Sequence, residues 1–156
     1  MLEIDIPGFG PVKLEHIVSD FTGTMSVNGN ILPGVKERLD RIADILQIHI
    51  ITADTFGTAR NELKGIRSEI HILNVPRQDI QKKEYVAGLS GERVVAFGNG
   101  NNDRRMLKTA PIGIAVTEGE GCSVDAILAA NIHVRSIIDG LDLLLNPMRL
   151  RATLQY

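Results

Sequence analysis

The sequence contains a single cysteine, no tryptophan and no long apolar run, and each shortage excludes a class of protein. Cys122 cannot form an intrachain disulfide, and a lone thiol is typical of a reducing compartment, so we expect a cytoplasmic protein. The N-terminus lacks a basic stretch followed by an apolar one, and no apolar run approaches the ~20 residues that span a bilayer. We therefore expect neither export nor membrane insertion.

Aromatic residues make up 4% of the chain and the formal net charge is -2, so the stacking side chains and the basic surface of nucleic-acid-binding proteins are not expected. At 156 residues the chain has the length of one compact domain, which we place at residues 1–156. The histidines at positions 16, 49, 71 and 133 have apolar or β-branched neighbours and lack the sequence spacing of metal ligands. They are expected in strands.

Short apolar runs alternate with segments of helical spacing along most of the chain. The expected strands are 16–19, 48–52, 70–73, 94–98, 112–116 and 132–135. The expected helices are 35–46, 55–64, 79–89, 103–109, 124–130 and 137–145. Strands that are apolar throughout and are separated by helix-length segments predict a parallel sheet covered by helices on both faces. The predicted fold class is therefore α/β, a doubly wound parallel sheet.

Three segments fall outside this alternation. Residues 2–6 and 12–15 alternate apolar with polar side chains around a turn rich in glycine, which predicts an N-terminal β-hairpin. Residues 25–34 contain several turn-forming dipeptides and predict a flap directly after the first strand of the sheet. The tail at residues 147–156 is expected to form a separate short helix or an extended arm.

Polar residues gather directly after three of the expected strands. Ligands of open parallel sheets bind at the carboxyl ends of the strands, so these positions form the candidate site. The three segments are residues 20–24, 52–54 and 98–103. Each segment taken alone is more often a turn or a helix cap than a binding site, so their combination carries the argument.

The order of these motifs resembles the haloacid dehalogenase superfamily. The sequence DFTGT at residues 20–24 is similar to the phosphorylation motif of P-type ATPases, and GNGNND at residues 98–103 is similar to their GDGxND. Thr52 matches the threonine or serine that ends a strand in this superfamily. Lys82 matches its lysine, with Lys83 as the alternative. Four motifs in this order form a specific signal.

The resemblance implies a phosphate-handling site in which Asp20 is the nucleophile, since a carboxylate that attacks phosphorus divides the transfer into two steps. The Thr52 hydroxyl and the Lys82 ammonium would stabilise the negative charge of the phosphoryl group. Glycine at position 23 would let the chain turn and bring main-chain N–H groups to the anion. The expected substrate-binding residues are Phe21, Gly23, Ala53 and Asn102.

The resemblance also implies a magnesium ion, because hard cations prefer oxygen ligands. The expected metal ligands are Asp20, the Thr22 main-chain carbonyl, Asn99 and Asp103. The expected substrate is a small phosphorylated molecule or a phosphoprotein. No segment long enough for a cap domain separates the motifs, so the site is expected to be open. A homo-oligomer in which residues 25–34 cover a neighbouring site would close it.

Two residues depart from the superfamily's pattern. Most phosphatases of the superfamily carry a second aspartate, which acts as general acid and base, at the position of Thr22. The ATPases also lack this aspartate. Without a proton donor for the leaving group, a preference for acyl or aryl phosphates is implied. Asn99 replaces a metal-binding aspartate, so weaker magnesium binding is expected. The predicted function is a magnesium-dependent phosphatase or phosphotransferase acting through phospho-Asp20. The alternatives are a regulatory or phosphate-binding module with little turnover, and a capless sugar-phosphate phosphatase assembled as a tetramer.

Overall fold

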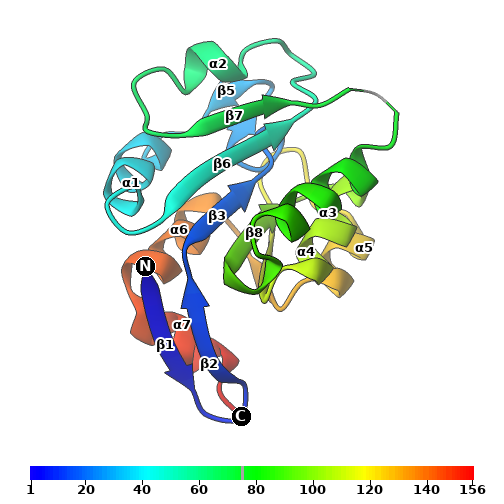
Figure 1. Ribbon diagram of the computed structural model, residues 1–156. Helices are drawn as coiled ribbons and strands as arrows, with labels where there is room; N and C mark the ends of the chain where they lie inside the picture. The colour runs from blue at the N-terminus through cyan, green and yellow to red at the C-terminus, as the bar shows by residue number, and fades with distance from the viewer. Residues whose placement is uncertain (75) are drawn as a thin grey trace.

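A computed structural model describes residues 1–74 and 76–156 of the chain, and its centre is a six-stranded sheet with the order β10-β9-β8-β3-β6-β7 (Figure 1). The strands are β3 (His16–Ser19), β6 (Gln47–Thr52), β7 (Glu69–Ile72), β8 (Val94–Gly98), β9 (Ile112–Val116) and β10 (Ile132–Val134). Each neighbouring pair runs parallel. The predicted doubly wound α/β sheet is confirmed.

Helices cover both faces of this sheet (Figure 1). The helices of the core are α1 (Val35–Ile42), α3 (Gln78–Gly88), α4 (Arg104–Thr109), α5 (Val124–Ala129) and α6 (Ile137–Leu145). Successive residues of a strand point to opposite faces, so Ile17 of β3 packs into the apolar cluster under α1 and α6. Val18 packs into the cluster under α3, α4 and α5. The central strands are apolar throughout because both of their faces are buried.

Two helices are shorter than their sequence patterns predict. Helix α1 buries Val35, Leu39 and Ile42 along one face and ends there, and residues 43–46 continue as a turn. The helix expected at residues 55–64 is reduced to α2 (Ala59–Glu62). Asp54 has a φ of 52° and its carboxylate accepts the N–H groups of Thr58 and Ala59, so the chain turns before this helix begins.

The flap predicted after β3 is a small antiparallel hairpin of β4 (Ser26–Val27) and β5 (Asn30–Ile31). Its two turn residues, Asn28 and Gly29, have φ values of 52° and 78°, which is the left-handed geometry that tight hairpins favour. The hairpin is fastened to its own chain, because Ile31 N–H donates to Glu62 and Asn28 N–H donates to Glu120 (3.1 Å each). In the described part of the chain no cap domain is inserted between β3 and α1.

The N-terminal hairpin is confirmed as β1 (Leu2–Ile6) paired antiparallel with β2 (Gly10–Leu14). Of the two alternatives for the tail, the helix is correct: α7 (Pro147–Leu154) packs against β1, and Tyr156 N–H donates to the Pro7 carbonyl (3.0 Å). Figure 1 shows this unit at the end of the sheet where β3 begins. No helix in residues 1–74 and 76–156 is long and apolar enough to cross a membrane. The 3-10 turns are η1 (Gly91–Arg93) and η2 (Asn101–Asp103).

Candidate active site

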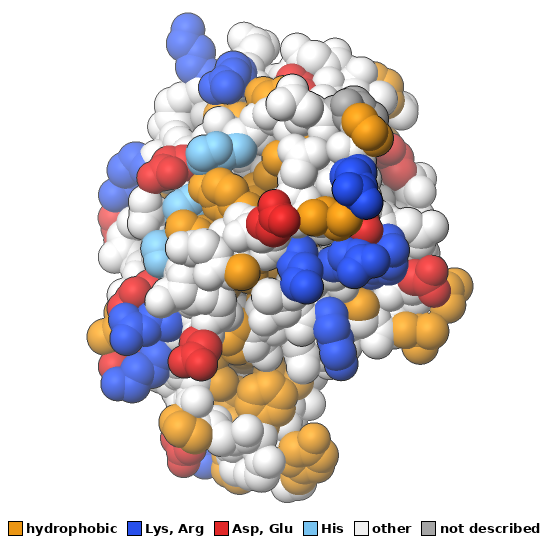
Figure 2. Space-filling view, turned by 45° about the vertical axis from the view of Figure 1, so that its right-hand side comes forward, with side chains coloured by type: hydrophobic (Ala, Val, Ile, Leu, Met, Phe, Trp, Pro, Cys, Tyr) orange, Lys and Arg blue, Asp and Glu red, His pale blue; other side chains and the backbone are white. Residues whose placement is uncertain are grey.

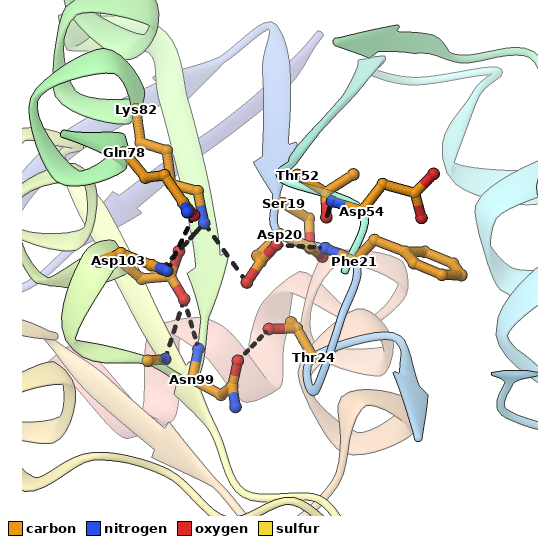
Figure 3. Close-up of polar contacts among 12 residues, drawn as sticks. Ser19, Asp20, Phe21, Thr24, Thr52, Asp54, Gln78, Lys82, Asn99 and Asp103 are labelled. Atoms are coloured by element: carbon orange, nitrogen blue, oxygen red, sulfur yellow. Dashed lines mark hydrogen bonds and ion pairs between the residues drawn. The ribbon is translucent and has the colours of Figure 1, made fainter. Parts of the chain in front are cut away.

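The chain turns back sharply after β3, and Asp20 stands at the start of this turn (Figure 3). Asp20 N–H donates to the Phe97 carbonyl of β8 (3.1 Å), and Asp20 Oδ1 accepts from Phe21 N–H (2.8 Å). The Phe21 carbonyl accepts the N–H groups of residues 24–26 at 3.0–3.2 Å. The Phe21 side chain is fully buried, so Phe21 anchors the loop through both its side chain and its backbone. Because Phe21 N–H holds Oδ1 of Asp20, Oδ2 is the oxygen that faces the neighbouring elements.

Gly23 lets this loop approach the loop after β8. Its φ is +78°, and a Cβ atom added there would lie 2.5 Å from Asn99 Nδ2, so a side chain at this position would displace Asn99. Thr24 Oγ1 donates to Asn99 Oδ1 (3.0 Å), and Asn99 Nδ2 donates to the Gly121 carbonyl (3.1 Å). The Asn99 amide thus joins three loops at the carboxyl edge of the sheet.

Lys82 of α3 brings a buried positive charge to this edge (Figure 3). Its side chain is 1% exposed, and Nζ lies 2.8 Å from Asp103 Oδ1 and 3.4 Å from Asp20 Oδ2. The same nitrogen donates to Asn102 Oδ1 (3.0 Å). Lys83, one position later on the helix, is exposed, so Lys82 is the lysine that contacts Asp20.

Asp103 is fully buried behind Asp20 and holds the loop after β8 in place. Its Oδ2 accepts the N–H groups of Asn99 and Gly100 at 2.9 Å each, and its Oδ1 accepts from Lys82. Each carboxylate oxygen therefore has a protein donor. A charge-assisted arrangement of this kind fixes a loop more firmly than neutral hydrogen bonds do.

Two carboxylates share one ammonium group in this buried cluster. Burial raises the pKa of Asp20 to about 7; the Lys82 ammonium opposes the rise and the Asp103 carboxylate adds to it. Burial acts to lower the pKa of Lys82, but the charges of Asp103 and Asp20 outweigh it and raise that pKa. Lys82 is therefore a permanent cation, whereas Asp20 changes its protonation state near neutral pH.

The cluster opens into a cavity of about 180 Å³. Its lining residues are Asp20, Thr22, Thr52, Ala53, Thr55, Gln78, Lys82, Asn99, Gly100 and Asn102. Seven of the residues named from the sequence are therefore brought together, while Phe21, Gly23 and Asp103 lie behind the cavity wall and hold it. Thr55 and Gln78 are additions that the sequence motifs did not indicate. Gln78 lies one helical turn before Lys82, and this i, i+4 spacing could have revealed it.

Two buried hydroxyl groups of the cavity wall have an O–H to offer a ligand. Thr52 is 1% exposed, and its Oγ1 accepts from Asp54 N–H (2.9 Å), which leaves its own O–H free to donate. Thr22 Oγ1 is buried, and among the described residues it has no hydrogen-bond partner. Unpaired buried polar atoms are costly, so a hydroxyl of this kind in a cavity wall indicates the position of a polar ligand.

The donors around Asp20 fit a magnesium ion. The Asp20 carboxylate, the Thr22 main-chain carbonyl and the Asn99 amide oxygen are all hard oxygen donors. Burial raises the pKa of Asp20, so a cation bound beside it would stabilise the ionised carboxylate. Asn99 Oδ1 has a second lone pair beyond the one that accepts from Thr24. Asp103 is fully buried and does not line the cavity, which makes it a support for the site rather than a direct ligand.

A larger hollow lies elsewhere, with a volume of about 660 Å³ on the outer side of α4 and α5. It is lined by Lys83, Arg104, Arg105, Lys108, Thr109, Asp125, Leu128 and Ala129. Figure 2 shows the basic side chains that gather on this side of the molecule. The hollow contains none of the motif residues. Two of its basic groups, Arg104 and Arg105, already pair with Asp79, whereas the smaller cavity contains the buried pair of Asp20 and Lys82. The smaller cavity is therefore the candidate active site.

Comparison with known families settles the family of the chain. The family model for haloacid dehalogenase-like hydrolases matches residues 36–127, which is more than half of the sequence. The chain belongs to the haloacid dehalogenase-like hydrolase family. The resemblance derived from the motifs is therefore confirmed.

Among curated proteins, this haloacid dehalogenase-like chain is 50% identical over 62 residues to an uncharacterised protein of Methanocaldococcus jannaschii, covering 40% of this chain and 67% of that protein. It is 27% identical over 135 residues to a probable copper-transporting ATPase of Arabidopsis thaliana. That alignment covers 83% of this chain but only 13% of the ATPase. The likeness to P-type ATPases is thus limited to a small part of those proteins.

Among solved structures, a putative haloacid dehalogenase family hydrolase of Streptomyces avermitilis superposes with a TM-score of 0.70 at 17% identity, with 87% of each chain covered. The cobalt-bound deoxy-D-mannose-octulosonate 8-phosphate phosphatase of Haemophilus influenzae superposes with a TM-score of 0.71 at 10% identity, covering 92% of this chain and 94% of that one. At these identities the comparisons establish a shared fold.

Proposed function

We propose that this haloacid dehalogenase-like chain is a magnesium-dependent phosphatase or phosphotransferase that acts through a phospho-Asp20 intermediate, in a single domain of residues 1–156. The observation that carries the proposal is the Asp20 carboxylate, which is buried, contacts Lys82 and opens into a cavity lined by hydroxyl groups. Cytoplasmic location and turnover of small phosphorylated molecules remain part of the same proposal.

In the first step Asp20 Oδ2 forms a bond to phosphorus, and the bond from phosphorus to the leaving oxygen breaks with its electron pair going to that oxygen. Oδ2 suits this role because Oδ1 is held by Phe21 N–H. In the second step water attacks the phosphoryl group and releases phosphate from Asp20; an acceptor hydroxyl in place of water would give a phosphotransferase. The pKa of about 7 allows Asp20 to be ionised at neutral pH.

The phosphoryl group carries negative charge on its outer oxygens, and three groups of the cavity can stabilise it. Lys82 Nζ supplies a fixed positive charge beside Asp20 Oδ2. The Thr52 and Thr22 hydroxyls supply O–H donors that have no acceptor among the described residues. Magnesium, when bound by Asp20, the Thr22 carbonyl and Asn99, would neutralise charge that builds up on the transferred group.

The hydroxyl at Thr22 limits the leaving groups. Among the described residues that line the cavity, Asp20 is the only carboxylic acid, and Asp103 behind it is occupied by three hydrogen bonds. The leaving oxygen therefore departs without a proton from the protein, which favours weakly basic leaving groups. Acyl and aryl phosphates are the proposed substrates, ahead of alkyl phosphates.

A phosphate-binding module with little turnover is the rival function. Asn99 favours it, because the amide is uncharged and its oxygen already accepts from Thr24. A sugar-phosphate phosphatase is a second rival, since the 8-phosphate phosphatases of Haemophilus influenzae and Moraxella catarrhalis share the fold. A homo-oligomer in which the β4–β5 hairpin covers a neighbouring subunit's site remains part of the proposal, since Asn28 and Asn30 of the hairpin are exposed.

Hydrolysis of acetyl phosphate and of an aryl phosphate, with and without magnesium, tests the proposal. The wild type is expected to turn over both substrates only with magnesium, and Asp20→Asn to lose at least about 10³-fold in kcat. Mass spectrometry of an acid-quenched reaction is expected to detect a phosphorylated Asp20 peptide. An alkyl phosphate and a sugar phosphate serve as comparison substrates.

The outcomes separate the three functions. Alkyl or sugar phosphates cleaved as fast as aryl phosphates would contradict the assignment based on Thr22. Turnover that survives in Asp20→Asn would exclude Asp20 as the nucleophile. Saturable phosphate binding without turnover in the wild type would favour the binding module.

A further inference from the structure

Three of the four histidines lie close together on one face of the sheet, away from the residues that line the Asp20 cavity. All four are strand or strand-end residues, as the sequence predicts, but the sequence spacing gave no sign of this cluster. In the pairing of β6 with β7, His49 lies opposite Glu69 and Ile51 lies opposite His71. Side chains two positions apart share a face, so His49, Glu69 and His71 point to the same side.

We propose that His49, Glu69 and His71 form a binding site for a divalent transition-metal ion of the zinc type. Glu69 Oε2 lies 3.6 Å from His49 Nδ1 and 3.7 Å from His71 Nε2. One ligand atom from each residue lies within 4.8 Å of the others. Tetrahedral zinc, with bonds of about 2.0–2.1 Å, separates neighbouring ligand atoms by about 3.4 Å, so small side-chain shifts complete the site.

The donor chemistry selects the class of ion. Two imidazole nitrogens and one carboxylate oxygen suit zinc and its neighbours cobalt and nickel, whereas magnesium prefers oxygen ligands. Three protein ligands leave a fourth position for water or another group. The site therefore differs in its donors from the oxygen-rich cavity around Asp20.

Neighbouring side chains orient the ligands. Gln47 Nε2 donates to Glu69 Oε1 (2.7 Å), which leaves Oε2 turned toward both histidines. His49 Nε2 lies 3.1 Å from His16 Nδ1, and when His49 donates this hydrogen bond its Nδ1 keeps a lone pair for a metal. The Tyr85 hydroxyl, 2.8 Å from His49 Nδ1, is the group that an ion would displace.

The site is open to solvent on one side. The side chains of Glu69 and His71 are 53% and 44% exposed, while His49 is 1% exposed and forms the floor. Figure 2 shows histidine side chains gathered on the surface of this side of the molecule. An ion can therefore reach the site without unfolding the chain.

Calorimetric titration with zinc, in the presence of saturating magnesium, tests the proposal. Wild-type chain is expected to bind one equivalent of zinc, and cobalt in place of zinc is expected to give the absorption bands of a tetrahedral site. Glu69→Gln and His71→Asn each remove one ligand from an exposed position and are expected to weaken zinc binding by at least about tenfold. His133→Asn is the matched control, because His133 is an exposed strand histidine outside the cluster.

The same titration is repeated with Asp20→Asn, which separates this site from the proposed active site. Unchanged zinc binding in that variant is expected, and it holds whether or not the chain is a phosphatase. Loss of zinc binding in Asp20→Asn would place the ion at the Asp20 cavity and overturn the proposal. Equal weakening by His133→Asn and His71→Asn, or the lack of a saturable equivalent in the wild type, would also overturn it.

Discussion

At the scale of single residues, the protonation of Asp20 links the site to the stability of the chain. Burial raises its pKa from 3.8 to about 7, so the folded chain holds this proton over a pH range in which the unfolded chain has released it. The unfolded state binds fewer protons in this range, and the stability therefore decreases as pH rises from about 4 to about 7. Above that range the contribution is constant.

Asp20→Asn removes this titration, and we predict that it stabilises the magnesium-free chain at high pH. The gain in the free energy of unfolding over wild type is expected to grow between pH 4 and pH 7 by at most about 1.4 kcal/mol per pH unit, and then to level off. Urea denaturation in the presence of a chelator at pH 4.5, 6 and 8 measures it. A difference that is the same at all three values would contradict the raised pKa.

The motifs predicted which residues meet in the cavity better than they predicted how each one is held there. Asp20 and Thr52 lie at one edge because the carboxyl ends of the parallel strands β3 and β6 meet there, which the strand pattern already implied, whereas Lys82 reaches the same edge from helix α3. The placement of Asp103 behind the wall depends on hydrogen bonds to backbone groups that no residue pattern specifies. The cluster around His49 escaped prediction because its ligands come from different strands, and their closeness depends on register.

At the scale of secondary structure elements, the phase of α3 decides between two adjacent lysines. The helix buries Lys82 and Val86, which are four residues apart and therefore share a face. Lys83 is turned by about 100° around the axis and lies in solvent. The apolar pattern of this helix is weak, so the sequence did not decide which of the two lysines faces the site. Packing of the helix against the sheet determines that it is Lys82.

Methionine at each of these positions gives a matched pair of variants. Lys82→Met removes the cation between two buried carboxylates, and kcat for acetyl phosphate is expected to fall roughly 10²–10³-fold. Lys83→Met is expected to keep kcat within about twofold, because exposed substitutions away from a site have small effects. Circular dichroism of both variants checks that the fold is retained. An equal loss of kcat in the two variants would show that the contact between Lys82 and Asp20 does not contribute to catalysis.

The boundaries of α1 and α2 mark the limit of periodicity as a guide to helix length. Both segments keep apolar residues at helical spacing beyond the true helix end, so the pattern alone extends them. The Asp54 carboxylate binds the N–H groups of Thr58 and Ala59 and delays α2, and this choice of partner is local chemistry that spacing does not encode. Turn dipeptides were the better guide, since they located the β4–β5 hairpin correctly.

At the scale of the whole molecule, the two ends of the sheet have different tasks. The carboxyl ends of the strands carry the Asp20 cavity, while the opposite end is closed by the β1–β2 hairpin and α7 (Figure 1). Leu150 of α7 is fully buried and joins the same apolar cluster as Leu14 and Ile17. The hairpin and the sheet therefore share one core. The sequence predicted the hairpin and left the tail undecided, because an eight-residue segment is helical only when a surface is present to pack against.

This division predicts that stability and catalysis can be separated by a change in α7. Leu150→Ala leaves a cavity in the shared core and is expected to lower the free energy of unfolding by about 2–5 kcal/mol. Met148→Ala, on the same helix at a side chain that is 68% exposed, is the control and is expected to change it by less than about 0.5 kcal/mol. Below the unfolding transition, both variants are expected to keep wild-type kcat for acetyl phosphate, because the strands between α7 and Asp20 are fixed by the sheet's own hydrogen bonds.

Urea denaturation and steady-state kinetics measure the free energy of unfolding and kcat on the same samples. A loss of kcat in Leu150→Ala at full folding would mean that the packing of the hairpin reaches Asp20 through β3, since Leu14 and Ile17 lie on that path.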